Sequence, residues 1–334
     1  KNKLSNMKNI IITSLLILSS INLFSQGKPH VKVFSNFNYD LNSDDNNTYQ
    51  AFEVKRAYLG YGYDLADNFS VKVTFDVGKN SAGSSYTTFL KIAALNWKPS
   101  DKLSLNFGMI GTKNFKFMEK AWGKRYIYKS FQDQNKWASS ADAGASMTYS
   151  ISNNLLIDAQ ILNGEGYKST QDDLGQMRGG AGITYNSDNL SLRFSRDMIP
   201  RKEYTDNFET QSINTFALSY TMSNINIGGE YNIRENTSNI LDNTSTAFSL
   251  FGNLDMGNGI SVFGRYDQSS SEDINEVQWN IDNEGELSIF GIEKQMTKGV
   301  KLAVNVRSFK NASLQNEQEA EAINSLYFNL EYKF

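Results

Sequence analysis

The 334-residue sequence has no cysteine, a single histidine and only three prolines. Without cysteine, disulfide bonds, thiolate nucleophiles and cysteine-based metal sites are excluded. The one histidine, His30, lies near the start of the chain, away from any catalytic motif, so an imidazole base or a multi-histidine metal site is not expected. We therefore predict a protein that is not an enzyme, with no catalytic residue, no metal and no cofactor.

Long hydrophobic runs are also missing. The mean hydropathy of −0.47 is too polar for a bundle of transmembrane helices. The apolar run Ile10–Leu18 follows lysines and precedes small residues, which is the pattern of a secretory signal peptide. A membrane anchor or a buried helix is the alternative, but the run is short for a permanent span. We predict a signal peptide over residues 1–25, cleavage before Gln26 and one domain over residues 26–334.

Positive charge is not in excess. Removing the three lysines of the predicted signal peptide leaves 30 basic and 36 acidic residues, a net charge of −6. Nucleic acids are polyanions and attract proteins with an excess of positive charge. We therefore expect no nucleic-acid partner.

Aromatic residues are plentiful instead, with 17 tyrosines and 21 phenylalanines, and many stand in alternating segments. In Phe69–Val77 one face is wholly apolar and the other polar, and residues 190–195 and 300–307 repeat the pattern. Membrane strands need about 9–11 residues and present alternate residues to lipid. Strands of soluble sandwiches are shorter, about 5–6 residues. The alternation thus predicts strands that cross a membrane.

Short turns rich in Asn, Asp and Gly separate these segments. Such residues tolerate the positive φ of tight hairpins. Seven turns join seven hairpins, and one further strand at each end gives an all-β, 16-stranded antiparallel transmembrane β-barrel, wide enough for an aqueous channel. The seven turns are predicted to be periplasmic and the eight other connections external. The turns are residues 65–68, 99–102, 151–154, 187–189, 222–224, 256–259 and 296–299.

The final segment, residues 326–334, alternates apolar and polar residues and ends in Phe334. It resembles the terminal strand by which outer-membrane barrels are recognised during assembly. An ordinary last strand of a soluble β-protein is the alternative. Together with the signal peptide, the segment predicts a location in the bacterial outer membrane.

The third external connection, residues 113–140, differs from the others. From Lys113 to Lys136 it has seven basic and two acidic residues, a net charge of +5, and residues 113–137 carry seven aromatic side chains. An aromatic loop of this kind is expected to pack, and the barrel lumen offers a surface. We predict a constricting loop that favours anions. The alternatives are an external loop binding lipopolysaccharide phosphates or a protein partner, or solvated charge. The predicted constriction residues are Lys113, Lys116, Lys120, Lys124, Arg125 and Lys129.

The polar faces of the predicted strands carry further basic residues. Acidic residues share these faces, so the lining alone does not indicate selectivity. The predicted lumen-lining residues are Arg56, Lys72, Arg178, Arg193, Arg265, Lys301 and Arg307.

Two segments resemble a known family. Phe52–Gly60 with Leu65–Ser70, and Asn163–Tyr167, are similar to segments of the phosphate-selective porin O and P family. This resemblance implies a 16-stranded trimeric channel that passes phosphate or polyphosphate along arginine and lysine ladders, with Arg56 in the lumen. The end of the signal peptide and the Asn-rich loops are similar to proteins of Bacteroidetes-type bacteria.

The leading hypothesis is an outer-membrane porin for small hydrophilic solutes, with a preference for anions or phosphate. The alternative is a structural or partner-binding barrel in a surface complex, in which residues 113–136 would be a docking patch. A barrel hydrolase would need a histidine beside its nucleophile, which the sequence does not offer. The expected partners are outer-membrane lipid, lipopolysaccharide, the permeating solutes and further copies of the chain as a homotrimer.

Overall fold

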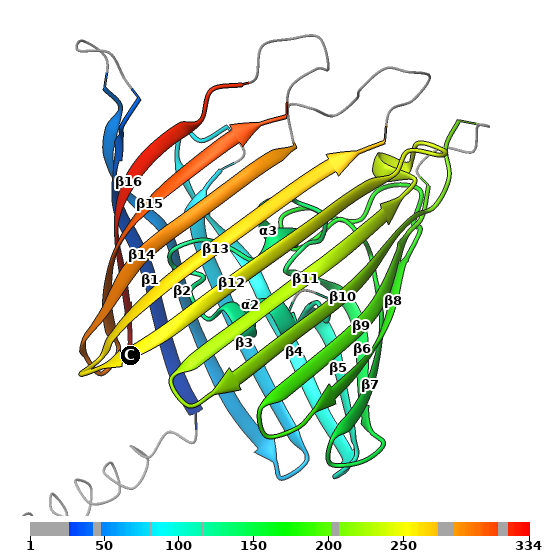
Figure 1. The fold of residues 1–334 in the computed structure, drawn as a ribbon. Helices are drawn as coiled ribbons and strands as arrows, with labels where there is room; N and C mark the ends of the chain where they lie inside the picture. The colour runs from blue at the N-terminus through cyan, green and yellow to red at the C-terminus, as the bar shows by residue number, and fades with distance from the viewer. Residues whose placement is uncertain are drawn as a thin grey trace, which may run out of the picture.

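The computed structural model is a closed β-barrel in which every strand pairs antiparallel with its neighbours in the chain, and β1 pairs with β16 (Figure 1). It describes residues 27–42, 48–80, 82–114, 116–201, 207–272, 284–312 and 320–334. The predicted signal peptide, residues 1–25, lies outside the described residues.

The barrel has sixteen strands, as the turns predicted. Strands and helices have the following bounds: β1 Gly27–Asp40, β2 Gln50–Ala66, β3 Phe69–Lys79, β4 Tyr86–Ser100, β5 Leu103–Gly111, α2 Lys116–Trp122, α3 Phe131–Gln134, β6 Ala141–Ser150, β7 Leu155–Leu162, β8 Arg178–Asn186, β9 Leu190–Ile199, β10 Gln211–Met222, β11 Ile225–Glu235, η1 Thr237–Asn239, β12 Ser245–Gly257, β13 Ile260–Ser271, β14 Gly285–Thr297, β15 Val300–Asn311 and β16 Ile323–Lys333. All seven predicted turns join consecutive strands, so this part of the prediction is confirmed.

The two ends of the chain close the sheet. Phe37 of β1 is paired with Phe328 of β16, and the backbone of Phe334 exchanges two hydrogen bonds with Val31, at 2.9 and 3.1 Å. Closure leaves no strand edge with unpaired backbone groups, which a sheet in hydrocarbon could not tolerate. The terminal alternating segment is therefore the strand that completes the barrel.

Alternation along the strands separates an apolar outer face from an inner face. Phe290 of β14 is 68% exposed on the outside, whereas its neighbour Ile289 is buried inside. An outer belt of this kind suits lipid. No helix in the described part of the chain is long and apolar enough to cross a membrane.

A β-bulge interrupts the alternation in β4. The pairing of β3 with β4 passes from Thr74–Ile92 to Phe75–Leu90 and skips Lys91. A bulge re-aims the side chain of the extra residue. Lys91 and Ile92 therefore both reach the interior, although they are neighbours in sequence.

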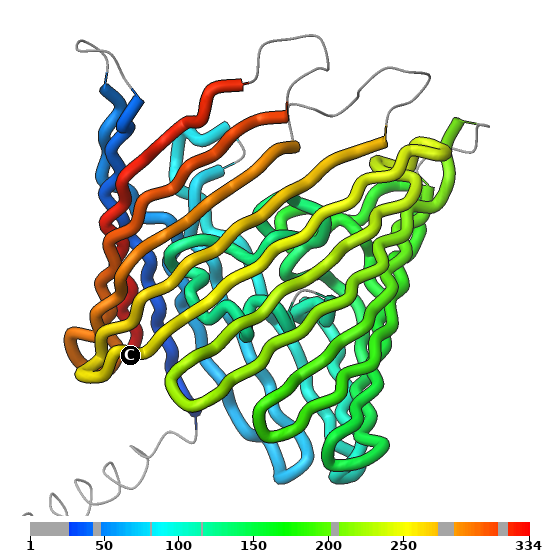
Figure 2. Tube along the Cα trace, in the orientation of Figure 1, coloured from blue at the N-terminus to red at the C-terminus, as the bar shows by residue number. Residues whose placement is uncertain are grey.

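The connection between β5 and β6 turns into the barrel. It contains α2 and α3, which lie within the ring of strands (Figures 1 and 2). We call residues 112–140 the inner loop; Phe115 is not among its described residues.

Candidate functional site

The inner loop is hydrogen-bonded to strands on the far side of the barrel. Arg307 of β15 donates to the carbonyl of Ile127 at 2.7 Å, and Arg265 of β13 donates to the carbonyl of Lys129 at 2.6 Å. Such bonds to buried carbonyls satisfy loop backbone groups that no longer meet bulk water. The loop is thus fixed to the wall formed by β10–β16.

An apolar cluster fills the space between the inner loop and that wall. The Trp122 ring lies 5.4 Å from the ring of Phe251 and 6.0 Å from that of Phe263, measured between centroids. Apolar residues at inward positions of β12–β15 complete the cluster. This packing accounts for the aromatic composition of the loop, because each ring removed from water stabilises the inward position. The buried members are Phe34, Met118, Trp122, Tyr126, Ile127, Ala217, Phe251, Phe263, Leu287, Ile289 and Ala303.

Charged groups of the inner loop are paired close to this cluster. Arg125 forms ion pairs with Asp133 at 2.5 Å and with Glu119 at 2.8 Å. Burial by itself would raise the pKa of Asp133, but Arg125, Lys129 and Lys91 together outweigh burial and hold that pKa below its usual range. Lys124, which is buried, pairs with Glu293 of β14 at 3.2 Å, and Tyr126 donates to Glu293 at 2.7 Å.

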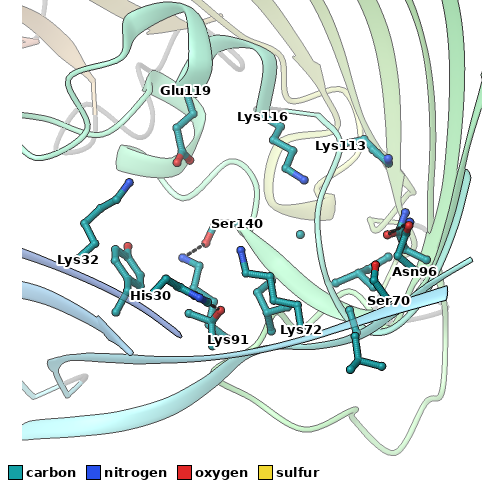
Figure 3. A pocket seen from close by; sticks show the side chains of 18 of the residues that line it. His30, Lys32, Ser70, Lys72, Lys91, Asn96, Lys113, Lys116, Glu119 and Ser140 are labelled. Carbon is teal, nitrogen blue, oxygen red and sulfur yellow. Dashed lines mark hydrogen bonds between the residues drawn. The ribbon is translucent and has the colours of Figure 1, made fainter. Parts of the chain in front are cut away.

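The opposite side of the interior remains open, as a cavity of about 470 Å³ between the inner loop and β1–β5. We call it the lysine cavity. Lys32 and Lys72 reach into it from the strands, and Lys113 and Lys116 from the inner loop (Figure 3). His30, Lys91 and Arg125 also line it, whereas its one acidic lining residue is Glu119.

These lysines are not neutralised by neighbouring carboxylates. Lys32, Lys72, Lys113 and Lys116 form no ion pair with an acidic residue in the described part of the chain. Glu119 is itself engaged with Arg125. Burial and the nearby Lys116 ammonium lower the pKa of Lys113. A water-filled recess with uncompensated charge of one sign concentrates ions of the other sign.

Lys91 is placed at the end of this cavity by the β4 bulge. Its ammonium donates to Ser140 Oγ at 2.8 Å and lies 3.8 Å from Asp76 Oδ2. It also lies over two tyrosine rings, 5.2 Å from the Tyr58 centroid and 4.8 Å from the Tyr167 centroid. The cation is therefore held by several partners at the end of the lysine cavity that borders Ser140.

A second cavity, of about 370 Å³, lies nearer the long connections. We call it the outer cavity. Arg56, Lys129, Lys136 and Lys168 line it, with Asp133 and Glu165 as its acidic residues; Ser140 borders both cavities. Ser140 thus lies between the two cavities, and Lys91 contacts it from the side of the lysine cavity.

Residues 163–167 bring Tyr167 into the interior. Gly164 and Gly166 have φ values of +110° and +79°, which residues with a side chain rarely adopt, and Gly166 is followed by a Tyr167 amide bonded to the Ala141 carbonyl. The Tyr167 hydroxyl donates to Asp76 at 2.5 Å, and Arg56 pairs with the same carboxylate at 2.8 Å. The two glycines therefore supply the positive φ angles that this segment needs to bring Tyr167 into the interior.

The predicted constriction residues fall into three groups. Lys113, Lys116 and Arg125 line the lysine cavity and Lys129 the outer cavity. Lys124 is buried against the wall, and the exposed Lys120 borders neither cavity. Their role in conduction stays a prediction.

The register places all seven predicted lumen residues on the inner face. Lys72 lines the lysine cavity, and Arg56 and Arg178 line the outer one. The others are engaged with protein groups. Those pairs are Arg193–Asp158 at 2.6 Å, Arg265–Asp267 at 2.6 Å, Lys301–Glu293 at 3.1 Å, and Arg307 with the Ile127 carbonyl at 2.7 Å; Arg178 is in turn paired with Asp197.

Sequence reasoning did not identify Lys32, Lys91 or Tyr167 as interior residues. The break in alternation at Lys91–Ile92 was a usable signal, because a bulge shifts the pattern by one residue. In the described part of the chain, no group of three acidic, histidine or cysteine side chains could hold a metal ion.

Sequence and structure comparisons agree with this architecture. Residues 31–114 match the model of the phosphate-selective porin O and P family. The match contains the segments 52–60 and 65–70, so this resemblance is confirmed; Asn163–Tyr167 lies beyond the matched residues. No curated protein sequence matches the chain.

Solved structures of outer-membrane proteins share the fold. Salmonella typhi OmpF, in a complex with daunomycin, has a TM-score of 0.69 at 12% identity, covering 92% of this chain and 97% of that one. Vibrio cholerae OmpT has a TM-score of 0.64 at 13% identity, covering 93% and 98%. Its in-vitro folded trimer form has a TM-score of 0.61 at 12% identity, covering 92% and 99%. The fold and the family match support an outer-membrane porin channel, located in the bacterial outer membrane.

Proposed function

We propose that the protein is a passive diffusion channel for small hydrophilic solutes and that it prefers anions, phosphate among them. The observation that carries the proposal is the lysine cavity, where Lys32, Lys72, Lys113 and Lys116 face one open space without ion-pair partners among the described residues. The name of the matched family is consistent with that preference.

The arrangement of the inner loop supports a single route. The loop packs apolar side chains against the side of β10–β16, and Ser140 borders both cavities on the other side. Solutes would pass from the outer cavity beside Lys91 into the lysine cavity. Positive charge at a narrow passage favours anions over cations.

Reversal potentials in planar bilayers test this proposal. Purified protein in a potassium chloride gradient should give stepwise currents and a reversal potential of the sign that indicates anion selectivity. The quadruple variant K32Q/K72Q/K113Q/K116Q should lose most of that selectivity while its conductance persists. Absence of any current from folded protein would contradict the channel, whereas cation selectivity in the unmodified protein would contradict the anion preference alone.

The alternative of a partner-binding barrel is less well supported. In that hypothesis residues 113–136 form an exposed docking patch, but Trp122, Tyr126 and Phe131 are buried within the barrel. An enzymatic function is the other alternative. His30 lies in the interior, where its ring is hydrogen-bonded to the Thr74 hydroxyl at 3.0 Å, and we propose no catalytic role for it.

Four further expectations accompany the proposal. Residues 1–25 would be removed on export, the barrel would form a homotrimer, and its apolar belt would contact lipid and lipopolysaccharide. No cofactor would be required. The trimer is supported by one structural neighbour that is described as a trimer form. Chemical cross-linking of the protein in native membranes would give a ladder ending at three subunits.

A further inference from the structure

Aromatic rings and lysines alternate along the open side of the interior. At the outer end, the Lys168 ammonium lies 4.7 Å from the centroid of the Phe89 ring. Phe89 meets Tyr167 edge-to-face, with centroids 6.2 Å apart. Phe89 and Tyr167 are partly exposed and Lys168 is exposed, so a solute in the outer part of the route can reach both the charge and the rings.

The same alternation continues toward the short turns. Lys91 lies between the rings of Tyr167 and Tyr58, 4.8 and 5.2 Å from their centroids. Tyr58 meets Phe34 edge-to-face at 5.8 Å, and the Lys32 ammonium is 5.9 Å from the Phe34 centroid. We call the seven residues the aromatic–lysine track; they are Lys168, Phe89, Tyr167, Lys91, Tyr58, Phe34 and Lys32.

From Lys168 to Tyr58 the track offers two kinds of contact, whereas the buried Phe34 supports Tyr58 and Lys32 from behind. An inorganic anion such as chloride or phosphate uses only the ammonium groups. An anion that is itself a flat ring can also place its face or edge against Phe89, Tyr167 and Tyr58, in the geometries that aromatic pairs prefer. The lysines lie near the rings through cation–π attraction, and a carboxylate entering between them exchanges that attraction for a direct ion pair.

We propose that the track selects small aromatic carboxylates, of which benzoate is the simplest, over saturated carboxylates of the same charge and size. This inference rests on the proposed function, because it names a solute class for the same route. It adds a contribution from the rings that a ladder of lysines and arginines alone does not supply.

The test compares benzoate with cyclohexanecarboxylate, which has the same charge at neutral pH and a ring of the same carbon count that is not aromatic. Bi-ionic reversal potentials against chloride give the permeability of each. We expect benzoate to be about three- to tenfold more permeant than cyclohexanecarboxylate, the size of one aromatic contact. Equal permeabilities, or a preference for the saturated ring, would overturn the inference while leaving the anion channel in place.

A matched pair of variants locates the effect. F89L keeps an apolar side chain on the inner face of β4 but removes the ring, whereas F107L makes the same change on the lipid-facing side of β5. F89L should reduce the ratio of benzoate to cyclohexanecarboxylate permeability, whereas F107L should leave that ratio unchanged. A benzoate preference that survives in F89L and in Y167L would also contradict the track. A failure of the channel itself is recognised separately, by the absence of chloride current.

Discussion

The Lys91 ammonium donates a hydrogen bond to Ser140 Oγ at 2.8 Å, and this contact joins the β4 bulge to the end of the inner loop. Because Ser140 borders both cavities, the contact lies between them, and the Asp76 carboxylate is 3.8 Å from the same ammonium. A regular strand would direct either Lys91 or Ile92 toward lipid. The bulge therefore lets both side chains face the interior, where Lys91 adds a cation beside Ile92.

Replacing Lys91 tests its place in the route. K91Q removes the charge and leaves a group that can still donate to Ser140, so anion selectivity should fall by about twofold or more while the barrel remains folded. K91E should lower the selectivity further. K98Q is the control, since Lys98 is an exposed residue near the turn at the end of the same strand. Equal reversal potentials for K91Q and K98Q would show that Lys91 does not contribute to anion selectivity.

Two lysines of α2 offer a second matched comparison. Lys116 lines the lysine cavity, whereas Lys120, one turn further along the helix and also exposed, borders neither cavity. Loss of one unit charge at the cavity wall should reduce anion selectivity about twofold, because the screened potential in water is modest. K116Q should show this reduction in a salt-gradient reversal potential, and K120Q should match the unmodified channel. The opposite ranking would mean that solutes pass along a different face of the helix.

Much of the fold was accessible from sequence because a barrel strand has a period of two and its turns have a characteristic composition. The segment Phe69–Val77 and the turn at residues 65–68 are both found where alternation and turn chemistry predicted them. Chain closure also followed, since the segment that ends in Phe334 could only complete the ring by pairing with β1. These are local patterns, and each is repeated many times along the chain.

The interior was less accessible, because it depends on contacts between distant segments. Arg307 and Arg265 have the residue type of pore cations, yet both are used to hold carbonyls of the inner loop. Nothing in the spacing of inward residues separates such an anchor from a residue that meets solutes. Lys91 was missed for a related reason: its position depends on the pairing of β4 with β3, which is a property of two strands.

The apolar cluster between the inner loop and the barrel wall gives a third prediction. F263A removes a buried ring that contacts Trp122 and should weaken the docked position of the loop by about 3–5 kcal/mol. A loosened loop leaves the lumen wider for part of the time, so single-channel recordings should show larger and noisier currents. F290A, on the neighbouring strand but facing outward, should leave the currents unchanged. Quiet currents of the original size in F263A would show that the loop does not depend on this contact.

Alkaline pH should weaken anion selectivity, because the route depends on protonated amines. Burial lowers the pKa of Lys113 and that of Lys129, and both residues border a cavity. An ordinary lysine loses its proton around pH 10.4; with a lowered pKa these two lose theirs earlier as the pH rises, and the positive charge of the route falls with them. The reversal potential should therefore begin to decline below the pH range of an ordinary lysine.

The double variant K113Q/K129Q isolates that contribution. It should start from a lower anion selectivity at neutral pH and show a smaller decline as the pH is raised, since two of the amines with a lowered pKa are gone. Acidification toward about pH 5 should change little through Asp133, because its lowered pKa keeps the carboxylate ionised and paired with Arg125. If the double variant loses as much anion selectivity at alkaline pH as the unmodified channel, then other cations titrate in this range and control the selectivity of the channel.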